Sequence, residues 1–393
     1  MQIVGIDKVK PGDVLGKSLF NKKSELLLSS GFELTDEMIL LMKSKGIRFV
    51  YVMNELTKDI APEEVITTTV RQIANQKMAE TFANVENNLA FETFGSENIK
   101  KRLEENRKLK KIVNMPAVRK VVGQVLEDIV ERQTMMFSGL QMKSTDGADY
   151  EHAVDTTVLA VLISRQFRYD YNEMKQLGAA AIVHDIGKMA FRELRQKPIT
   201  DLTADERMII REHPIYSKII LESSDPEAFV EQAVVMQHHE MENGRGYPQG
   251  LKGFGRPPTK DRGKDTGFIH RHAEILAVAN AYDNLITGSF DGTVYAPDQA
   301  ITMIVNGQAG TWNPFVVSAL VKVVQCYPVG TTVRVKDNAS KSFVGYKGVV
   351  AKENTDDQTK PTLILTHNSM GAQITPKLVE FTTERYMSIE LDM

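Results

Sequence analysis

Apolar residues recur with helical spacing through most of the chain. Six segments place them three and four positions apart, as expected for amphipathic helices. These predicted helices cover residues 154–167, 172–187, 204–213, 226–240, 272–286 and 313–325. Residues 61–144 contain few glycines and prolines and carry runs of charge, which indicates a helical connector. The pattern therefore predicts a mainly α-helical protein.

The two ends of the chain have a different pattern. Residues 1–54 indicate strand, loop, strand, helix and strand, with Thr35 as the N-cap of the helix and Gly46 at its end. Beyond Tyr327, the pattern changes to short strands separated by turn residues. The predicted strands cover residues 331–337, 346–353, 361–367 and 377–384. The predicted units are an α+β module (1–60), the connector (61–144), a helical domain (145–326) and a β-rich extension (327–393).

Composition narrows the functional classes. The 393 residues include 48 Lys and Arg against 51 Asp and Glu, and this balance gives no general attraction to nucleic acid or anionic lipid. The single cysteine, Cys326, excludes an intrachain disulfide and a zinc site built from several thiolates. The first residues lack a secretory pattern, and no apolar run reaches about 18 residues. We expect a cytoplasmic protein that binds neither nucleic acid nor membrane.

Histidines cluster in the predicted helical domain. Seven of the eight lie between His152 and His272, and two adjacent pairs stand out. Imidazole and carboxylate together suit iron, manganese, cobalt or zinc, and a carboxylate can bridge two ions. The candidate ligands come from several predicted helices: His152 opens one, His184 and Asp185 lie on another, His213 ends a third, and His238 and His239 lie at the end of a fourth.

Each histidine also has an ordinary structural explanation. A single buried histidine is more often a hydrogen-bonded structural residue than a ligand, and His270 and His272 are expected to cap or flank the first turn of their helix. The order of the whole set favours a shared site: a first histidine, then HDIGK at 184–188, a further histidine, and HHEMENGRGYP at 238–248.

These motifs resemble the HD-GYP subgroup of the HD-domain metal-dependent phosphohydrolases. The resemblance runs from EHAVDTTVLA through EHPIYSKIIL and ILAVANAYDNL to YPVGTTVRV, over about residues 145–365. It implies an HD-type helical bundle, preceded by a regulatory or dimerising α+β module and followed by the β-rich extension. It also implies two kinds of protein partner, a second copy of this chain and a diguanylate cyclase that contacts the GYP loop.

The resemblance implies a phosphodiesterase that hydrolyses cyclic di-GMP to linear pGpG and further to GMP. Two divalent ions, iron or manganese, would hold a bridging hydroxide that attacks the phosphate. Asp185 and Lys188 would be the catalytic residues. Lys188 would lie on the same helix face as Asp185, where it contacts the phosphate. By the same resemblance one metal is held by His152, His184 and Asp185, and the other by Asp185, His213, His238 and His239.

The GYP loop has two open interpretations. Gly246 allows a tight turn, and Tyr247 offers a ring face or a hydroxyl to the substrate, so both are candidate substrate-binding residues. A structural role, in which the loop closes over the metal site, is an equal alternative.

Three positions depart from the family pattern. Asn280 stands where the family usually has a metal-binding aspartate, and an amide oxygen is a neutral ligand. Ala148 replaces a glutamate of three-metal members, which favours two metals. Residues 286–297 lack the usual arginine-containing phosphate contact. The alternatives are therefore a weak or inactive member that acts as a nucleotide sensor or interaction module, and a phosphodiesterase for another cyclic dinucleotide.

Overall fold

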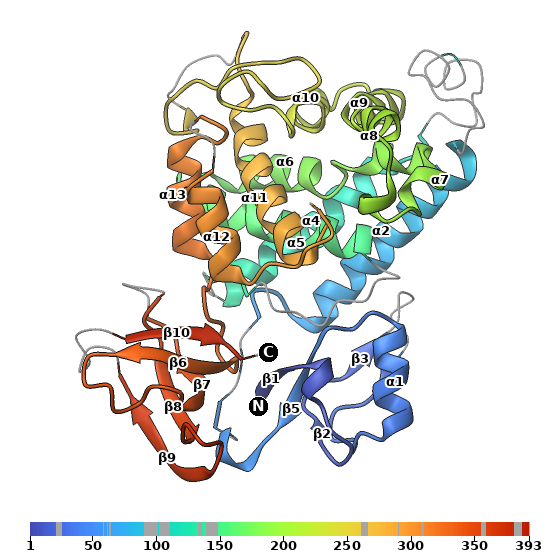
Figure 1. The fold of residues 1–393 in the computed structure, drawn as a ribbon. Helices are drawn as coiled ribbons and strands as arrows, with labels where there is room; N and C mark the ends of the chain where they lie inside the picture. The colour runs from blue at the N-terminus through green and yellow to red at the C-terminus, as the bar shows by residue number, and fades with distance from the viewer. Residues whose placement is uncertain are drawn as a thin grey trace.

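The helical part and the two chain ends form distinct layers. The computed structural model describes residues 1–20, 26–57, 59–60, 62, 64–89, 101, 111–132, 136–138, 148–260, 266–289, 291–307, 310–354, 359–380 and 387–392. Helices fill the upper part of Figure 1, while the N-terminal module and the C-terminal sheet lie below them. The predicted mainly helical architecture, with an α+β module in front and a β-rich extension behind, is confirmed.

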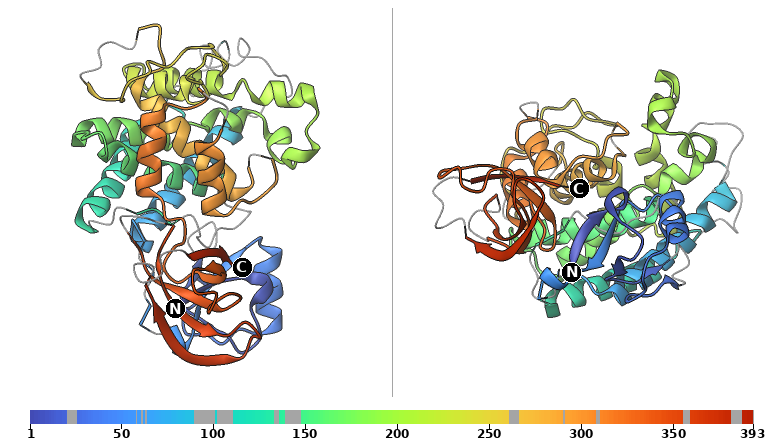
Figure 2. Two further views of the ribbon diagram at one scale, coloured as in Figure 1. Left: turned by 60° about the vertical axis from the view of Figure 1, so that its left-hand side comes forward. Right: turned by 60° about the horizontal axis from the view of Figure 1, so that its bottom comes forward.

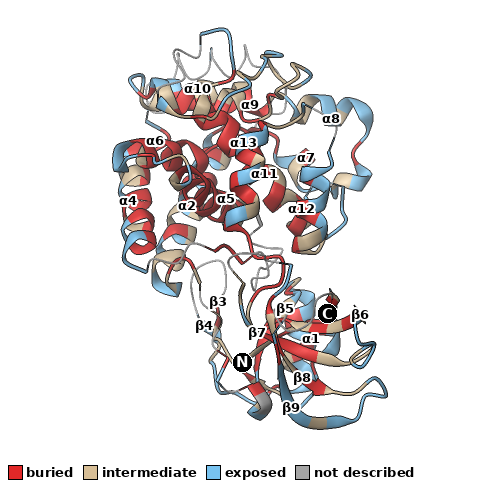
Figure 3. Ribbon diagram, turned by 90° about the vertical axis from the view of Figure 1, so that its left-hand side faces the viewer, coloured by how far each residue is buried: buried red, intermediate tan, exposed pale blue. Residues whose placement is uncertain are grey.

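The helical part is built around one continuous apolar core. Its helices are α2 (Thr68–Leu89), α4 (Met115–Arg132), α5 (Ala148–Arg165), α6 (Tyr171–Ala181), α7 (Arg192–Arg195), α8 (Ala204–Ile210), α9 (His213–Ser224), α10 (Phe229–Gln237), α11 (Arg271–Thr287), α12 (Pro297–Val305) and α13 (Pro314–Val323). Figure 3 shows buried residues concentrated in α5, α6 and α11. Within the described residues, no helix is long and apolar enough to cross a membrane.

The predicted connector shares this core. Helices α2 and α4 contribute buried residues such as Met78 and Val122 to the same cluster as α5 and α11. Connector residues 90–100, 102–110, 133–135 and 139–144 lie outside the described part of the chain. The domain boundary at residue 144 stays a prediction, because the apolar core continues on both sides of it.

Local sequence explains where several helices begin and end. Asp170 caps α6, and its side chain accepts from the Glu173 backbone while Glu173 reaches back to the Asp170 N–H. Thr203 and Glu206 form the same arrangement at α8. Helix α11 ends at Gly288, whose φ of +80° suits a residue without a side chain.

The N-terminal module has its own small core. Strands β1 (Gln2–Gly5), β5 (Phe49–Met53) and β2 (Val14–Leu15) form an antiparallel sheet in that order, and β3 (Leu19–Phe20) pairs with β4 (Leu26–Leu28). The predicted helix is α1 (Asp36–Ser44), and the Thr35 side chain accepts from the Met38 N–H as its N-cap. The sequence prediction for this module is confirmed.

The C-terminal extension is a five-stranded antiparallel sheet. Its order is β10-β6-β7-β8-β9, with bounds β6 (Thr332–Asn338), β7 (Lys347–Lys352), β8 (Thr362–His367), β9 (Gln373–Val379) and β10 (Met387–Leu391). The first three predicted strands are confirmed. The fourth, 377–384, overlaps only the end of β9, and its residues 381–384 lie outside the described part. Strand β10 was not predicted.

The two chain ends meet beside each other, which the sequence did not predict. The Ile3 N–H donates to the Gly330 carbonyl at 2.6 Å, and Lys8 pairs with Asp392 at 2.9 Å. Leu391 packs against the small cluster that contains Ile3. Figures 1 and 2 show the N-terminal module and the C-terminal sheet side by side below the helices. The β-rich extension therefore contacts the N-terminal module as well as the helical part.

Candidate metal centre

His184 and Asp185 lie in a turn, and this corrects the prediction that they lie on a helix. Helix α6 ends at Ala181, four turn residues follow, and a 3₁₀ helix covers Ile186–Ala190. On an α-helix, adjacent side chains would point about 100° apart. The turn instead brings both side chains to the same centre, where His184 Nε2 lies 3.4 Å from Asp185 Oδ2.

Lys188 lies on the 3₁₀ helix, so the prediction of an α-helical face is also corrected. Residues three apart eclipse one another on a 3₁₀ helix, whose period is three residues. Lys188 Nζ accordingly lies 2.6 Å from Asp185 Oδ2. The ammonium group is 27% exposed, whereas the carboxylate is 6% exposed. Lys188 therefore lies on the solvent side of Asp185.

His213 begins helix α9, although the sequence was interpreted as placing it at the end of a helix. The preceding helix, α8, ends at Ile210, and Pro214 occupies the first turn of α9, where its missing N–H costs no hydrogen bond. A close approach holds this helix to the turn: a Cβ on Gly187 would lie 2.2 Å from the His213 carbonyl oxygen. Only glycine allows this packing.

The remaining predicted histidines come from three further places. His152 lies in the first turns of α5, His238 is the C-cap residue of α10, and His239 follows it. His270 caps α11 by accepting from the His272 N–H at 3.2 Å, which confirms its predicted capping role. The centre therefore collects side chains from α5, α9, α10 and the turn after α6.

Four of the imidazoles are oriented in the same way. Three rings place Nδ1 against a backbone carbonyl three residues earlier: His184 on Ala181 at 2.7 Å, His213 on Ile210 at 2.8 Å and His238 on Val235 at 2.7 Å. The fourth, His152, places Nδ1 2.7 Å from Asp283 Oδ2. A carbonyl or carboxylate at Nδ1 fixes the proton there, so Nε2 presents its lone pair to the centre.

The Nε2 atoms that face the centre lie so close together in pairs that their lone pairs would repel each other. His152 Nε2 and His184 Nε2 are 3.3 Å apart, and His213 Nε2 and His238 Nε2 are 3.2 Å apart. With both protons held at Nδ1, each pair brings two lone pairs face to face. A shared cation removes this repulsion, so the orientation of the rings fits metal binding.

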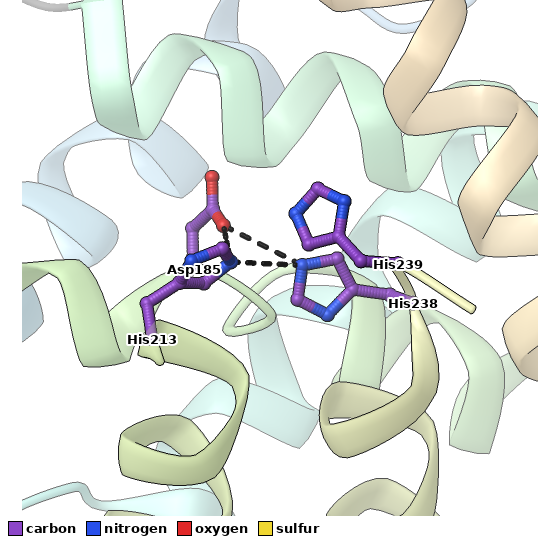
Figure 4. Close-up of side chains that lie close together, drawn as sticks. All are labelled: Asp185, His213, His238 and His239. Atoms are coloured by element: carbon purple, nitrogen blue, oxygen red, sulfur yellow. Dashed lines mark hydrogen bonds and ion pairs between the residues drawn. The ribbon is translucent and has the colours of Figure 1, made fainter. Parts of the chain in front are cut away.

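The donors form two overlapping groups that share Asp185. In each group, the candidate ligand atoms lie within 4.8 Å of one another. Figure 4 shows the larger group, in which the Asp185 carboxylate faces His213 and His238 while His239 lies beside them. Asp185 Oδ1 is 3.1 Å from His213 Nε2. The groups are Asp185, His213, His238 and His239, and His152, His184 and Asp185.

Burial keeps the larger group in the state that binds metal. Desolvation lowers the pKa of His213, His238 and His239, and that of His238 falls to about 3. Burial alone would raise the pKa of Asp185, but the imidazoles of His184 and His213 and the Lys188 ammonium hold it well below its ordinary value. Metal ligands must be neutral imidazole and ionised carboxylate, and these shifts favour both states.

His239 carries a further sign of a missing partner. Its Nε2 is buried, and among the described residues it has no hydrogen-bond partner. Buried polar atoms are nearly always satisfied, so an unsatisfied imidazole nitrogen beside three other donors fits a metal ligand. The two groups are therefore suited to divalent metal ions of the type that imidazole and carboxylate bind.

The GYP loop packs on the centre. The Tyr247 ring stacks on the His239 ring with centroids 4.6 Å apart and an interplanar angle of 15°, and the Arg211 guanidinium lies 4.3 Å from the Tyr247 centroid. A Cβ on Gly246 would lie 2.3 Å from the Met241 nitrogen, so the loop requires glycine there. These contacts favour the structural interpretation of the loop. Substrate binding by Gly246 and Tyr247 stays a prediction.

Asn280 lies on the helix that carries Asp283, and its oxygen has a partner within that helix. It is buried on α11, and Oδ1 accepts from Asn284 Nδ2 at 2.7 Å. Its assignment as a metal ligand stays a prediction. The same helix supplies Asp283, the partner of His152, which the sequence analysis did not single out. Its contact was missed because 131 residues separate the two side chains in the chain.

A cavity opens beside the smaller group. It has a volume of about 170 Å³, and its wall includes His152, Asp185 and Lys188. The rest of the wall combines apolar, basic and polar side chains: Asp149, Phe191, Leu194, Arg195, Lys197, Ile199, Leu202, Ile210, Asn284 and Ser289. The cavity gives a small molecule access to the shared carboxylate.

Comparison with known proteins supports the interpretation of the motifs. Residues 124–313 match the family model described as HD domain. The chain is 28% identical over 236 residues to the cyclic di-GMP phosphodiesterase PA4108 of Pseudomonas aeruginosa, covering 60% of this chain and 51% of that protein. It is 25% identical over 193 residues to the cyclic di-GMP phosphodiesterase response regulator RpfG of Xanthomonas campestris, covering 49% and 48%. The matches span about half the length of these relatives.

Among solved structures, the chain is similar to Bd1817, an HDG"Y"P protein from Bdellovibrio bacteriovorus. The TM-score is 0.43 at 18% identity, covering 81% of this chain and 97% of Bd1817.

The helical bundle, the two donor groups and these sequence matches define the class. Residues 124–313 match an HD domain, and this match, the relatives and the motifs HDIGK, HHE and GYP together support the HD-GYP family.

Proposed function

We propose that this protein is a cyclic di-GMP phosphodiesterase that works with two divalent metal ions, iron or manganese. The observation that supports this most directly is the pair of donor groups that share Asp185 beside a cavity. Two bound ions would supply positive charge at the phosphate oxygens and lower the pKa of a water molecule. The names of the relatives support the choice of substrate. The proposed product is linear pGpG, with GMP as the product of a second hydrolysis.

The residues of the chain have separate roles in this proposal. His152, His184 and Asp185 hold one ion, and Asp185 with the three remaining histidines of the larger group holds the other. Lys188 extends from Asp185 to the cavity and binds a phosphate oxygen there. Asp283 positions His152 through its Nδ1. Tyr247 positions His239 by stacking on it.

One observation favours a second candidate, a nucleotide sensor with weak or no activity. Asn280 adds no charge to the smaller group, and its oxygen accepts a hydrogen bond from Asn284. If the smaller group held its metal too loosely for turnover, the cavity would still bind a nucleotide. The sensor therefore binds cyclic di-GMP without producing pGpG.

A single experiment distinguishes the phosphodiesterase from the nucleotide sensor. The full chain is reconstituted anaerobically with ferrous iron or with manganese and incubated with cyclic di-GMP, and the products are separated by chromatography. We expect pGpG, and we expect Lys188→Ala to lower its rate of formation by about 100-fold.

Lys218→Ala is the matched control, because Lys218 is an exposed lysine on α9 that pairs with Glu222 and lies outside the cavity wall. Binding of cyclic di-GMP without any product would establish the sensor. Neither binding nor hydrolysis would overturn both candidates.

A further inference from the structure

Two segments that contribute to the cavity wall differ in their content of basic residues. It lies between the loop that follows α11, represented by Ser289, and the segment from α7 to the 3₁₀ helix Ile199–Asp201. Residues 286–297 contain no lysine or arginine, whereas residues 192–197 contain three basic residues. The two segments also touch, since a Cβ on Gly292 would lie 3.1 Å from Thr200 Cγ2. Among the described residues of the wall, the basic side chains other than Lys188 come from residues 192–197.

Carboxylates of neighbouring helices hold the two arginines of this segment. Arg195 pairs with Asp149 on α5 and, at 2.7 Å, with Glu86 on α2. Arg192 lies 3.6 Å from the same Glu86. Because Arg195 bridges two helices, its charge is already neutralised and its position is fixed. Arg195 therefore serves the structure of the segment, and Arg192 is not part of the cavity wall.

Lys197 is held in a different way. It lines the cavity, is 46% exposed, and pairs with Glu206 at 2.5 Å. Glu206 also accepts from the Thr203 N–H at 2.9 Å, so the capping arrangement of α8 keeps this carboxylate in place without Lys197. An exposed lysine pair of this kind contributes little to stability, so the ammonium can leave Glu206 for an anion at small cost.

The proposed substrate carries two negatively charged phosphodiester groups, and each needs a contact in the site. A cyclic dinucleotide carries two phosphodiester groups on opposite sides of its ring, and only one of them can lie at the metal centre. The cavity volume of about 170 Å³ is below the ~300–1,000 Å³ typical of pockets that enclose a whole ligand, so it takes only part of the molecule. The wall also contains apolar side chains that suit the face of a purine: Phe191, Leu194, Ile199, Leu202 and Ile210.

Resting on the proposed function, we propose that Lys197 binds the second, non-reacting phosphate of the cyclic dinucleotide. Lys188, which lines the same cavity, then contacts the phosphate that is cleaved. Lys197 makes the site selective for ligands with two phosphates. A substrate with a single phosphodiester uses the metal centre and Lys188 but not Lys197.

The test compares two substrates on the metal-loaded full chain. Cyclic di-GMP has two phosphates, and bis(p-nitrophenyl) phosphate has one. We expect Lys197→Ala to raise the KM and the calorimetric Kd for cyclic di-GMP about fivefold, and to leave bis(p-nitrophenyl) phosphate hydrolysis unchanged. Lys197→Arg should restore the Kd. The Kd of the Lys197→Ala variant should also depend less on ionic strength than that of the wild type.

Two further variants separate a charge effect from a structural one. Lys218→Ala, a similarly exposed lysine at 40%, should change neither substrate. Glu206→Gln keeps an acceptor for the Thr203 N–H but removes the competing charge, so its Kd for cyclic di-GMP should equal or fall below that of the wild type. A rise for Glu206→Gln as large as that for Lys197→Ala would overturn the proposal.

The outcomes distinguish this inference from the proposed function. If cyclic di-GMP is hydrolysed and Lys197→Ala leaves its Kd unchanged, or weakens both substrates equally, the subsite is wrong and the phosphodiesterase stands. If cyclic di-GMP binds without hydrolysis and Lys197→Ala raises its Kd, the subsite stands and the phosphodiesterase fails. If cyclic di-GMP does not bind at all, both fail.

Discussion

The two donor groups that share Asp185 are built differently. The larger group has three histidines besides the carboxylate, and backbone carbonyls orient two of their rings. The smaller group has two histidines, and a distant carboxylate, Asp283, orients one of them. Asn280, the further ligand that the sequence predicts for this group, is neutral. The larger group should therefore bind its metal more tightly than the smaller group.

The two groups also differ in their access from the cavity. The GYP loop packs on the larger group through Tyr247, whereas the cavity wall includes His152 of the smaller group. A metal held by the smaller group would therefore be the one that a ligand in the cavity could reach. The comparison predicts that substitutions in the smaller group change activity more readily than they change the fold.

The largest effect is expected from removing the shared carboxylate. Asp185→Ala should weaken metal binding in both groups by more than about 100-fold, because a direct ligand contributes more than the groups that orient it. Metal analysis of the purified variant measures this. Retention of both ions would show that Asp185 does not bridge them.

A smaller effect, limited to one group, is expected at Asp283. Asp283→Asn removes the charge that orients His152 and should weaken metal binding in the smaller group about 10-fold, leaving the larger group intact. A competition titration with a chelator resolves the two affinities. Asp291→Asn, an exposed aspartate that bonds Tyr295, is the control. Equal weakening of both groups would contradict the division.

The opposite change is expected at Asn280. Asn280→Asp adds a negative charge beside the smaller group and should tighten its metal by up to about tenfold, because the number of charged ligands sets affinity. The same titration gives the result, with Asn88→Asp on the exposed face of α2 as the control. An unchanged affinity would place Asn280 outside the ligand set.

The last prediction concerns the stability of the metal-free protein. Burial lowers the pKa of His238 from 6.5 to about 3, so below about pH 6.5 the unfolded chain binds a proton that the folded chain does not. The folded state therefore loses stability as pH falls, by about 2 kcal/mol at pH 5 for this histidine. Thermal melts of metal-free protein measure the loss. His238→Asn should flatten the pH dependence, and an unchanged slope would contradict the assignment.

Sequence patterns predicted most of the fold because their signals are local. Helical periodicity, the Thr35 cap and the alternation in 331–337 each depend on neighbours a few residues apart. The prediction was wrong for His184 and Asp185, because an apolar run does not reveal that a helix ends before it reaches the ligands. The small residues of that run, which pack closely, look the same in a helix and in the turn that follows.

Sequence patterns did not predict the contacts between segments that lie far apart in the chain. Asp283 meets His152 and Tyr247 stacks on His239 only after the helices pack, and no spacing in the chain encodes either contact. The meeting of Ile3 with Gly330 likewise joins the two ends of the chain. Lys197 lies in an unremarkable polar segment, and only the cavity separates it from other surface lysines.

The most direct test of the account counts metal ions in single-ligand variants. The reconstituted full chain should hold two ions with unequal affinities. His213→Ala should remove the tighter ion and retain the weaker one, and His152→Ala should do the reverse. Elemental analysis gives the number of bound ions, and a chelator titration gives their affinities. A single ion in the wild type, or loss of the same ion in both variants, would contradict two metal sites that share Asp185.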